Sequence, residues 1–496
     1  MPTSAAWIPL EIIEQILLEL DPLEVAPFIQ TCRTFDLAFA RSPDQHFWRQ
    51  LYLQQPFDDP RTCLTPLGYK VPAESIHWRH NLQRIIRART IAADPSLCRP
   101  NERVTVLRTF IDMATHIPPA TSTSSDPSSN LLWIAATLRG GALLDHELWE
   151  LSDEEKQLRA QLHTYFGLTP RDAKTQRKIE ARGYVYNMRH YTYANGFGPY
   201  HAEDEEKREG ALDDEGQGLR VNWVHMQALH HDVSMHLVNL TEDDPFEYAI
   251  YPMSMPYCQS LIPEGVDMEK TRDWAGVEGL WHCAFCFIDH RELLLYNNWN
   301  VGAPLDPTMF GDPSFVEIFR IIPVNFRILS TEPNPKHPTR PRINFAGEVQ
   351  DDHTMVGHVE VIEDGHIRWH FVSGEEGQAI WSGEGVQVGS VRSPFGVIGC
   401  WTTIFHDQHD PVGVVPTIVC SARGDHASVK TLTNVLTWTF SFGEASTLSV
   451  SDAWYFAFAT IHYMEASTRR QALRIGLFRP CRDRSLEPCG VTPRGY

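Results

Sequence analysis

The alternation of apolar and polar residues on either side of Glu363-Asp364-Gly365 constrains the fold of this chain more than any other feature. In a strand, successive side chains point to opposite faces, so the length of a hairpin loop decides which residues share a face. A two-residue loop at Asp364-Gly365 would place Val361 on the face of Arg368. A three-residue loop, with Gly365 in the left-handed conformation of a bulge, instead aligns Val361 with Ile367 and Val359 with Trp369. The sequence therefore predicts a β-hairpin over 356–372 with one apolar face.

The other face of this hairpin carries Glu360 opposite Arg368 and His358 opposite His370. That face could meet solvent or a polar barrel lumen, and the pattern alone leaves both open.

Short runs of β-branched and aromatic residues, separated by Gly, Pro and Asn, continue from about Glu242 and indicate many strands. The run Gly279–Phe287 alternates, with Trp281, Cys283, Phe285 and Phe287 on one face, and Asp289–Arg291 then turns into Leu293–Tyr296. Further strands are expected at Ile380-Trp381, Val386–Val388 and Val397–Trp401. We expect an antiparallel β domain over 241–412, built as a small up-and-down barrel or curled sheet, and therefore an α+β chain.

Composition restricts the class of protein. A length of 496 residues, with 42% hydrophobic residues, predicts two or three domains. The formal net charge of -20 disfavours nucleic-acid binding, because phosphates would be repelled. No run approaches the roughly 20 apolar residues of a membrane span, and the start MPTSAAW does not resemble a signal peptide. We therefore expect a cytoplasmic or nuclear protein without membrane contact, whose 10 cysteines form no structural disulfides.

The first 55 residues predict three short helices. Pro9 stands at a helix start and is followed by apolar residues at helical spacing. Asp21-Pro22-Leu23-Glu24 combines a capping carboxylate with proline at the first helical position, which predicts a second start. Ser42 to Gln45 repeats this capping pattern before a third helix. So small a unit cannot bury its large apolar side chains by itself and needs a partner or an adjoining domain.

Several short motifs in this region occur in a fixed order: Ile8-Pro9-x-Glu11, Ile16-Leu17-x-x-Leu20, Glu24-Val25, Cys32-Arg33 and Trp48-Arg49-x-Leu51. In that order they resemble the F-box family. Phe35 stands where the family usually has tryptophan, and Ile8 where it usually has leucine.

This resemblance implies a non-catalytic subunit that docks on the Skp-type adaptor and, through it, on the cullin of an SCF-type ubiquitin ligase. The implied adaptor-binding residues are Ile8, Pro9, Ile12, Ile16, Leu17, Leu20 and Val25. An ordinary helical cap on the next domain is the alternative reading of the same apolar pattern.

The region 56–240 is predicted to be mostly helical, with an exposed loop near 118–130 and a solvated acidic run from Glu203 to Glu215. Capping pairs predict helix starts near Asp153 and Pro170. One probable helix carries His225, His230, His231, Asp232 and His236. The separation of His231 and His236 is not that of helical chelators, and Asp232 with His236 supplies only one pair. We therefore predict polar surface or hydrogen-bonded histidines there, and no metal.

No other motif predicts chemistry. Cys283 and Cys286 are three apart in a strand and point to opposite faces, so they are not expected to chelate. The glycines at 383, 385 and 389 miss the dinucleotide-binding spacing by one residue. His406–Asp410 is typical of a turn before Pro411. No catalytic residue and no cofactor is predicted.

The segment from about Leu131 to Gly413 resembles a group of fungal F-box proteins, on the residues Leu138–Asp145, His146–Glu150 and Ser390–Val397. Beyond it, 413–496 carries a net charge of +3 against -23 for the first 412 residues. We expect a divergent tail that leaves the barrel short of its last strands.

Taken together, these features favour a substrate receptor whose β domain presents an unidentified protein substrate. A small-ligand-binding barrel, or a barrel enzyme, with an F-box that controls its turnover or location is the alternative. In that case His358 and His370 should contribute to ligand binding. A scaffold without any ligase role is a further alternative, in which the N-terminal helices only pack on the rest of the chain.

Overall fold

The computed structural model describes residues 8–41, 45–121, 127–202, 218–237, 255–297, 305–348, 353–375, 378–407 and 409–420. Two compact units divide the chain, Met1–Asp21 with Ala445–Tyr496, and Pro22–Glu444. Helix α1 (Leu10–Leu18) is the described element of the first unit. It begins where the sequence predicts, and the Pro9 carbonyl accepts hydrogen bonds from the Ile12 and Ile13 amides at 3.0 and 3.2 Å. The predicted capping residue Ser42 and the acidic run 203–215 lie outside the described residues.

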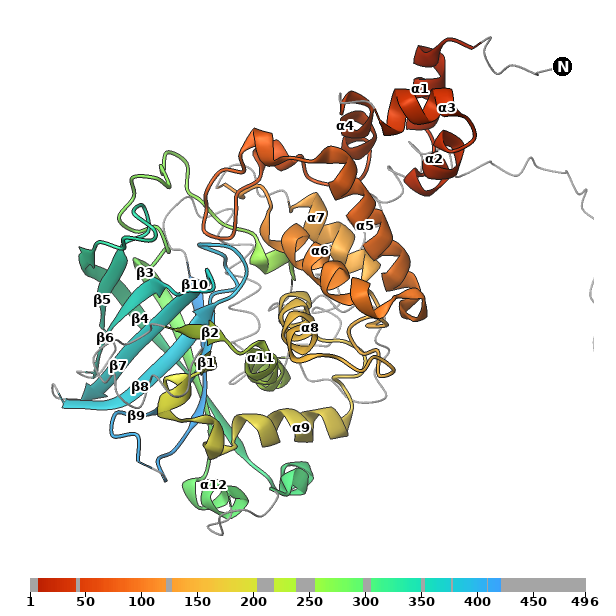
Figure 1. The fold of residues 1–496 in the computed structure, drawn as a ribbon. Helices are drawn as coiled ribbons and strands as arrows, with labels where there is room; N and C mark the ends of the chain where they lie inside the picture. Colours follow the sequence, from red (N-terminus) through yellow and green to blue (C-terminus); the bar gives the residue numbers. More distant parts are fainter. Residues whose placement is uncertain are drawn as a thin grey trace, which may run out of the picture. The chain divides into compact units, whose positions relative to one another are not determined.

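The second unit contains the other described helices and the described strands (Figure 1). Its helices are α2 (Pro22–Ile29), α3 (Arg33–Phe35), α4 (His46–Leu53), α5 (Trp78–Ala93), α6 (Arg103–Thr115), α7 (Ser129–Thr137), α8 (Asp153–Phe166), α9 (Thr175–Val185), α11 (Trp223–Leu237) and α12 (His290–Asn297). A π-helical turn spans Asp36–Ala40, and short 3-10 turns lie at Pro60–Thr62, Ala73–Ser75, Pro95–Leu97, Pro100–Glu102, Met188–His190, Tyr193–Asn195, Met255–Cys258 and Pro307–Gly311.

Local capping explains where α8 begins. The Ser152 hydroxyl accepts a hydrogen bond from the Glu155 amide, and the Glu155 carboxylate accepts one from the Ser152 amide. This reciprocal pair is the capping box that the sequence predicts.

The predicted helix start near Pro170 is wrong, because the next helix begins at Thr175. The Thr169 amide does donate to Asp172 Oδ2 at 2.8 Å, but only a turn follows. That turn buries the Asp172 carboxylate, which lies 3.3 Å from His163 Nε2 and 3.5 Å from Arg177 Nε. Asp172 is therefore part of a buried group of charged residues and does not cap a helix.

Eight strands form a closed antiparallel barrel, which confirms the predicted α+β class with a barrel. In chain order they are β3 (Gly279–Ile288), β4 (Glu317–Glu332), β5 (Arg342–Glu348), β6 (His353–Val361), β7 (Ile367–Glu375), β8 (Gln378–Gln387), β9 (Val397–Thr403) and β10 (Gly413–Cys420). Each strand pairs with the next, and β10 pairs with β3 to close the barrel (Figure 1). A separate two-stranded sheet joins β1 (Tyr200–Ala202) and β2 (Leu219–Val221).

Two expectations for this domain are wrong. The change of composition at Gly413 does not leave the barrel short of strands, because β10 begins at that residue and supplies the closing pairs to β9 and β3. The segment after Asp289 is not a strand but helix α12, because it buries Leu293 and Tyr296 at helical spacing. The rest of the tail, 421–496, lies outside the described residues.

The hairpin register is the one that the parity argument predicts. Val361 pairs with Ile367, Val359 with Trp369, Glu360 with Arg368 and His358 with His370. Gly365 has a φ of 81°, and its amide donates to the Ile362 carbonyl at 3.0 Å. The loop therefore has three residues and uses the left-handed conformation that favours glycine.

Apolar side chains fill the barrel. Trp281 of β3 and Trp369 of β7 lie on strands that are not neighbours, yet their ring centroids are 4.9 Å apart. They meet inside the barrel, within a buried cluster drawn from β3 to β7, β9 and β10. Val359 and Trp369 therefore face inward, and the alternative of a polar lumen lined by His358 and His370 is wrong.

Aromatic residues and glycines alternate around this interior. Phe345 pairs with Gly357, Gly357 with Phe371, Phe371 with Gly383, Gly383 with Trp401, and Trp401 with Gly413. A Cβ atom at Gly383 would lie 2.3 Å from the ring of Phe371, so the ring occupies the space that the glycine leaves. Large and small residues on adjacent strands fill the narrow interior of a small barrel in this way.

Candidate functional site

The predicted adaptor-binding residues differ in how far they are exposed. Ile8, Ile12 and Ile16 are 47%, 51% and 48% exposed, and Pro9 is exposed as well. Because they are spaced by four residues, Ile12 and Ile16 share one face of α1, and the exposed Ile8 lies two residues before the helix. Leu20 is partly exposed, whereas Leu17 and Val25 are fully buried. The accessible apolar face of α1 is therefore made by Ile8, Ile12 and Ile16.

Trp48 has an internal role in the second unit. Its Nε1 donates to the Phe39 carbonyl at 2.8 Å, and the guanidinium of Arg79 lies 5.3 Å from its ring centroid. Trp48 is 6% exposed, so it links α4 to the turn before it and to α5.

A network of charges occupies the outer face of strands β6, β7 and β8. Glu384 accepts two hydrogen bonds from Arg368, at 2.9 and 2.6 Å, and lies 2.8 Å from His370 Nδ1. Arg368 also donates to Glu360 at 3.0 Å. The Tyr200 hydroxyl, from β1, donates to the Gly385 carbonyl, so this edge of the wall is covered. Arg368 and Glu384 are 3% and 4% exposed.

The geometry of this network favours a structural role. The rings of His358 and His370 are tilted by 39° with centroids 5.0 Å apart, and both belong to the network rather than to a ligand cavity inside the barrel. The bidentate Arg368–Glu384 pair satisfies both carboxylate oxygens, as a buried acid requires.

Acid should weaken the folded state through Glu384. Burial acts to raise the pKa of Glu384, but the charges and hydrogen bonds of Arg368 and His370 outweigh it and lower the pKa from 4.5 to about 2. Because the pKa of Glu384 is lower in the folded than in the unfolded protein, its ionised carboxylate stabilises the folded state at pH values above about 4.5. This stabilisation is lost as the pH falls from about 4.5 toward 2. Urea unfolding of the wild type across this range should show that loss. The curve of Glu384→Gln should be flatter, and identical pH dependence in the two proteins would contradict the assignment.

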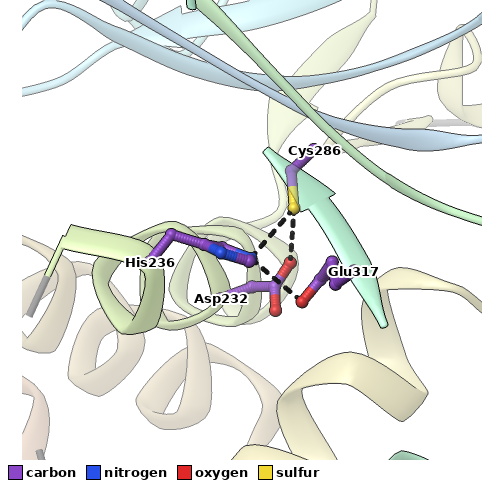
Figure 2. A group of neighbouring side chains, drawn as sticks. All are labelled: Asp232, His236, Cys286 and Glu317. Carbon is purple, nitrogen blue, oxygen red and sulfur yellow. Dashed lines mark hydrogen bonds and ion pairs between the residues drawn. The ribbon is translucent and has the colours of Figure 1, made fainter. Parts of the chain in front are cut away.

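A second cluster brings together four side chains from a helix and two strands. Asp232 and His236 lie one turn apart on α11, Cys286 projects from the outer face of β3, and Glu317 stands at the start of β4 (Figure 2). His236 Nε2 lies 3.2 Å from Cys286 Sγ and 3.0 Å from Glu317 Oε2. Cys286 Sγ lies 3.9 Å from Asp232 Oδ2. The four side chains point toward one another, as Figure 2 shows.

Two further residues from α9 and its C-terminal end contact the carboxylates of this cluster. Arg182 Nε lies 2.9 Å from Glu317 Oε2 and 3.6 Å from Asp232 Oδ1. The Tyr186 hydroxyl donates to Glu317 Oε1. Burial and the neighbouring carboxylate of Glu317 raise the pKa of Asp232, and burial with the charges of both acids raises the pKa of Cys286. Burial opposes ionisation of Glu317 too, but His236 and Arg182 lower its pKa.

Sequence reasoning found only half of this cluster. It placed Asp232 and His236 one turn apart, and it placed Cys283 and Cys286 on opposite faces of one strand, which the burial of Cys283 in the barrel core confirms. It could not place Cys286 and Glu317 against α11. The other histidines of α11 are not polar surface, since His225, His230 and His231 are 1%, 1% and 5% exposed.

Comparison of the chain with known protein families, with curated proteins and with solved structures finds no match. Among the described residues, no helix has the length and apolar character needed to span a membrane. Seven cysteines of the described chain are free thiols: Cys32, Cys63, Cys98, Cys258, Cys283, Cys286 and Cys400.

Proposed function

We propose that this protein is the substrate receptor of an SCF-type ubiquitin ligase, and that the Ile8-Ile12-Ile16 face of α1 binds the Skp-type adaptor. The observation that carries the proposal is the concentration of exposed apolar side chains near the N-terminus. Of fifteen large hydrophobic side chains that are exposed in the described chain, six lie in the first 40 residues. Three of these form the α1 face, and the others are Leu10, Leu23 and Leu37.

The energetics of burial support a partner for this face. Burying one large aliphatic side chain completely contributes about 1.5–3 kcal/mol. Ile8, Ile12 and Ile16 are about half exposed, so a partner groove that covers all three would gain roughly half of this for each of them. The order of the motifs that resemble the F-box family supports a Skp-type adaptor as this partner. Because Leu17 and Val25 are buried, the proposal limits the adaptor contact to the exposed Ile8, Pro9, Ile12 and Ile16.

The barrel is suited to presenting a surface rather than to enclosing a ligand. Trp281, Phe326, Phe345 and Trp369 are buried together in its interior, in the place that a small-ligand barrel would keep open. The receptor proposal therefore assigns substrate contact to the outside of the barrel and its loops, where recognition residues usually lie.

Substitution of the α1 face should abolish adaptor binding without unfolding the protein. The double variant Ile12→Asp/Ile16→Asp places two charges on exposed positions, so the fold is retained while the partner groove would have to bury carboxylates. Co-purification with a tagged Skp-type adaptor should fall at least tenfold.

The matched control is Leu148→Asp/Leu295→Asp, which changes two leucines that are 84% and 70% exposed elsewhere in the chain. It should bind the adaptor like the wild type. Equal recovery of the adaptor by the α1 variant and the wild type, or no recovery by either, would refute the proposal.

A further inference from the structure

The second cluster contains the donor types of a zinc site. Asp232 and Glu317 offer carboxylate oxygens, His236 an imidazole nitrogen and Cys286 a sulfur, and one donor atom from each lies within 4.8 Å of the others. Donors about 2.0–2.3 Å from a tetrahedral zinc ion lie roughly 3.3–3.8 Å from one another. The measured separations of 3.2 Å for His236–Cys286, 3.0 Å for His236–Glu317 and 3.9 Å for Cys286–Asp232 lie close to this range.

Two carboxylates with buried side chains share this cluster with one guanidinium. Arg182 Nε lies 2.9 Å from Glu317 Oε2 and 3.6 Å from Asp232 Oδ1, and that second oxygen accepts no hydrogen bond. Burying two neighbouring carboxylates is costly, and a cation between them would offset that cost.

We propose that Asp232, His236, Cys286 and Glu317 bind one Zn²⁺ ion. The sulfur and nitrogen donors favour zinc over Ca²⁺ or Mg²⁺, which prefer oxygen ligands throughout. Four protein donors complete a tetrahedral shell and leave no open position, as in structural zinc sites. The ion would join α11 to strands β3 and β4 and so fix this helix on the barrel wall.

Arg182 is compatible with a cation at this place. On binding, the Cys286 thiol gives its proton to solvent and the sulfur binds the ion as thiolate. The two charges of the ion and that of Arg182 then balance the thiolate and the two carboxylates. Arg182 contacts Glu317 Oε2 and Asp232 Oδ1, and Tyr186 contacts Glu317 Oε1, so both residues would orient the carboxylates, as partners outside the ligand shell commonly do.

Metal analysis of the purified full-length protein tests the proposal. After dialysis against buffer with micromolar zinc, mass spectrometry of the metals should find about one zinc per chain. Cobalt in place of zinc should give the thiolate-to-cobalt charge-transfer absorption that reports a Co–S bond. Zinc at the level of the dialysis buffer in the wild type would overturn the proposal.

Variants decide whether the ion sits in this cluster. Cys286→Ser should remove the charge-transfer band and weaken zinc binding by roughly 100-fold. Cys98→Ser, which changes a partly exposed thiol outside the cluster, should keep both. Near-ultraviolet circular dichroism establishes that each variant is folded. A folded Cys286→Ser protein with wild-type zinc content and an unchanged cobalt spectrum would refute the assignment. If Cys286→Ser does not fold, His236→Gln takes its place, and wild-type zinc content in that folded variant would refute the assignment in the same way.

Discussion

Replacing Arg368 with methionine should lower the free energy of unfolding by about 3–5 kcal/mol, because the buried Glu384 carboxylate would lose both of its guanidinium hydrogen bonds. Methionine keeps the apolar stem of the side chain, so the loss reports the charge and its hydrogen bonds rather than packing. His370 Nδ1, 2.8 Å from Glu384, is a single remaining contact and cannot replace a bidentate one. Urea unfolding monitored by tryptophan fluorescence measures the effect.

Arg327→Met provides the control on the same barrel. The Arg327 side chain is 63% exposed and lies 3.6 Å from Glu348, so its removal should cost less than about 1 kcal/mol. The double variant Arg368→Met/Glu384→Met should recover part of the loss, since replacing both members of a buried pair leaves no unpaired charge. Equal losses of unfolding free energy in Arg368→Met and Arg327→Met would contradict the prediction that the buried Glu384 carboxylate depends on Arg368.

Phe371 and Gly383 should behave as one packing unit inside the barrel. Phe371→Ala should cost about 3–5 kcal/mol, because it leaves a cavity among buried aromatic side chains. Gly383→Leu should cost about 1–3 kcal/mol, because the new side chain would occupy the space of the Phe371 ring. In the double variant Phe371→Ala/Gly383→Leu, the leucine enters the space that the ring has left, so the loss should be smaller than the sum of the single losses.

A thermodynamic cycle of the four proteins, by urea unfolding, measures this coupling. Gly365→Leu is unsuitable as a control, because its positive φ would add strain of its own. Val356→Leu is better, since Val356 lies on β6 and is 49% exposed, and it should change stability by less than about 0.5 kcal/mol. If the stability losses of Phe371→Ala and Gly383→Leu add up within about 0.5 kcal/mol in the double variant, the two positions are not coupled, which would contradict the prediction that they form one packing unit.

The hairpin of β6 and β7 could be predicted from the sequence because its information is local. The position of Gly365 and the parity of Val359, Val361, Ile367 and Trp369 suffice to fix the loop and the register. The same parity placed Cys283 and Cys286 on opposite faces. No local feature of the sequence determines whether the apolar face of the hairpin packs on a second sheet or lines the inside of a barrel. The sequence therefore could not predict whether the barrel interior is polar or apolar.

The cluster of Asp232, His236, Cys286 and Glu317 could not be predicted because its members are distant in sequence. Glu317 reaches Cys286 only through the pairing of β3 with β4, in which Ile288 pairs with Glu317 and Cys286 with Phe319. The approach of α11 to this wall depends on packing, which includes the stacking of His236 on Phe319 with ring centroids 5.0 Å apart. Helical spacing alone supplied one Asp–His pair, which is why the sequence predicted no metal. Likewise, capping chemistry at Thr169 resembled a helix start, although Asp172 is held by buried histidines.

Hydrogen–deuterium exchange of the purified full-length protein, with and without a purified Skp-type adaptor, tests the receptor proposal most directly. The account predicts that a saturating amount of adaptor slows exchange of the α1 amides in Leu10–Leu18, and that Ile12→Asp/Ile16→Asp removes this protection while exchange in the barrel strands stays unchanged. Exchange of α1 that is the same with and without the adaptor would contradict it.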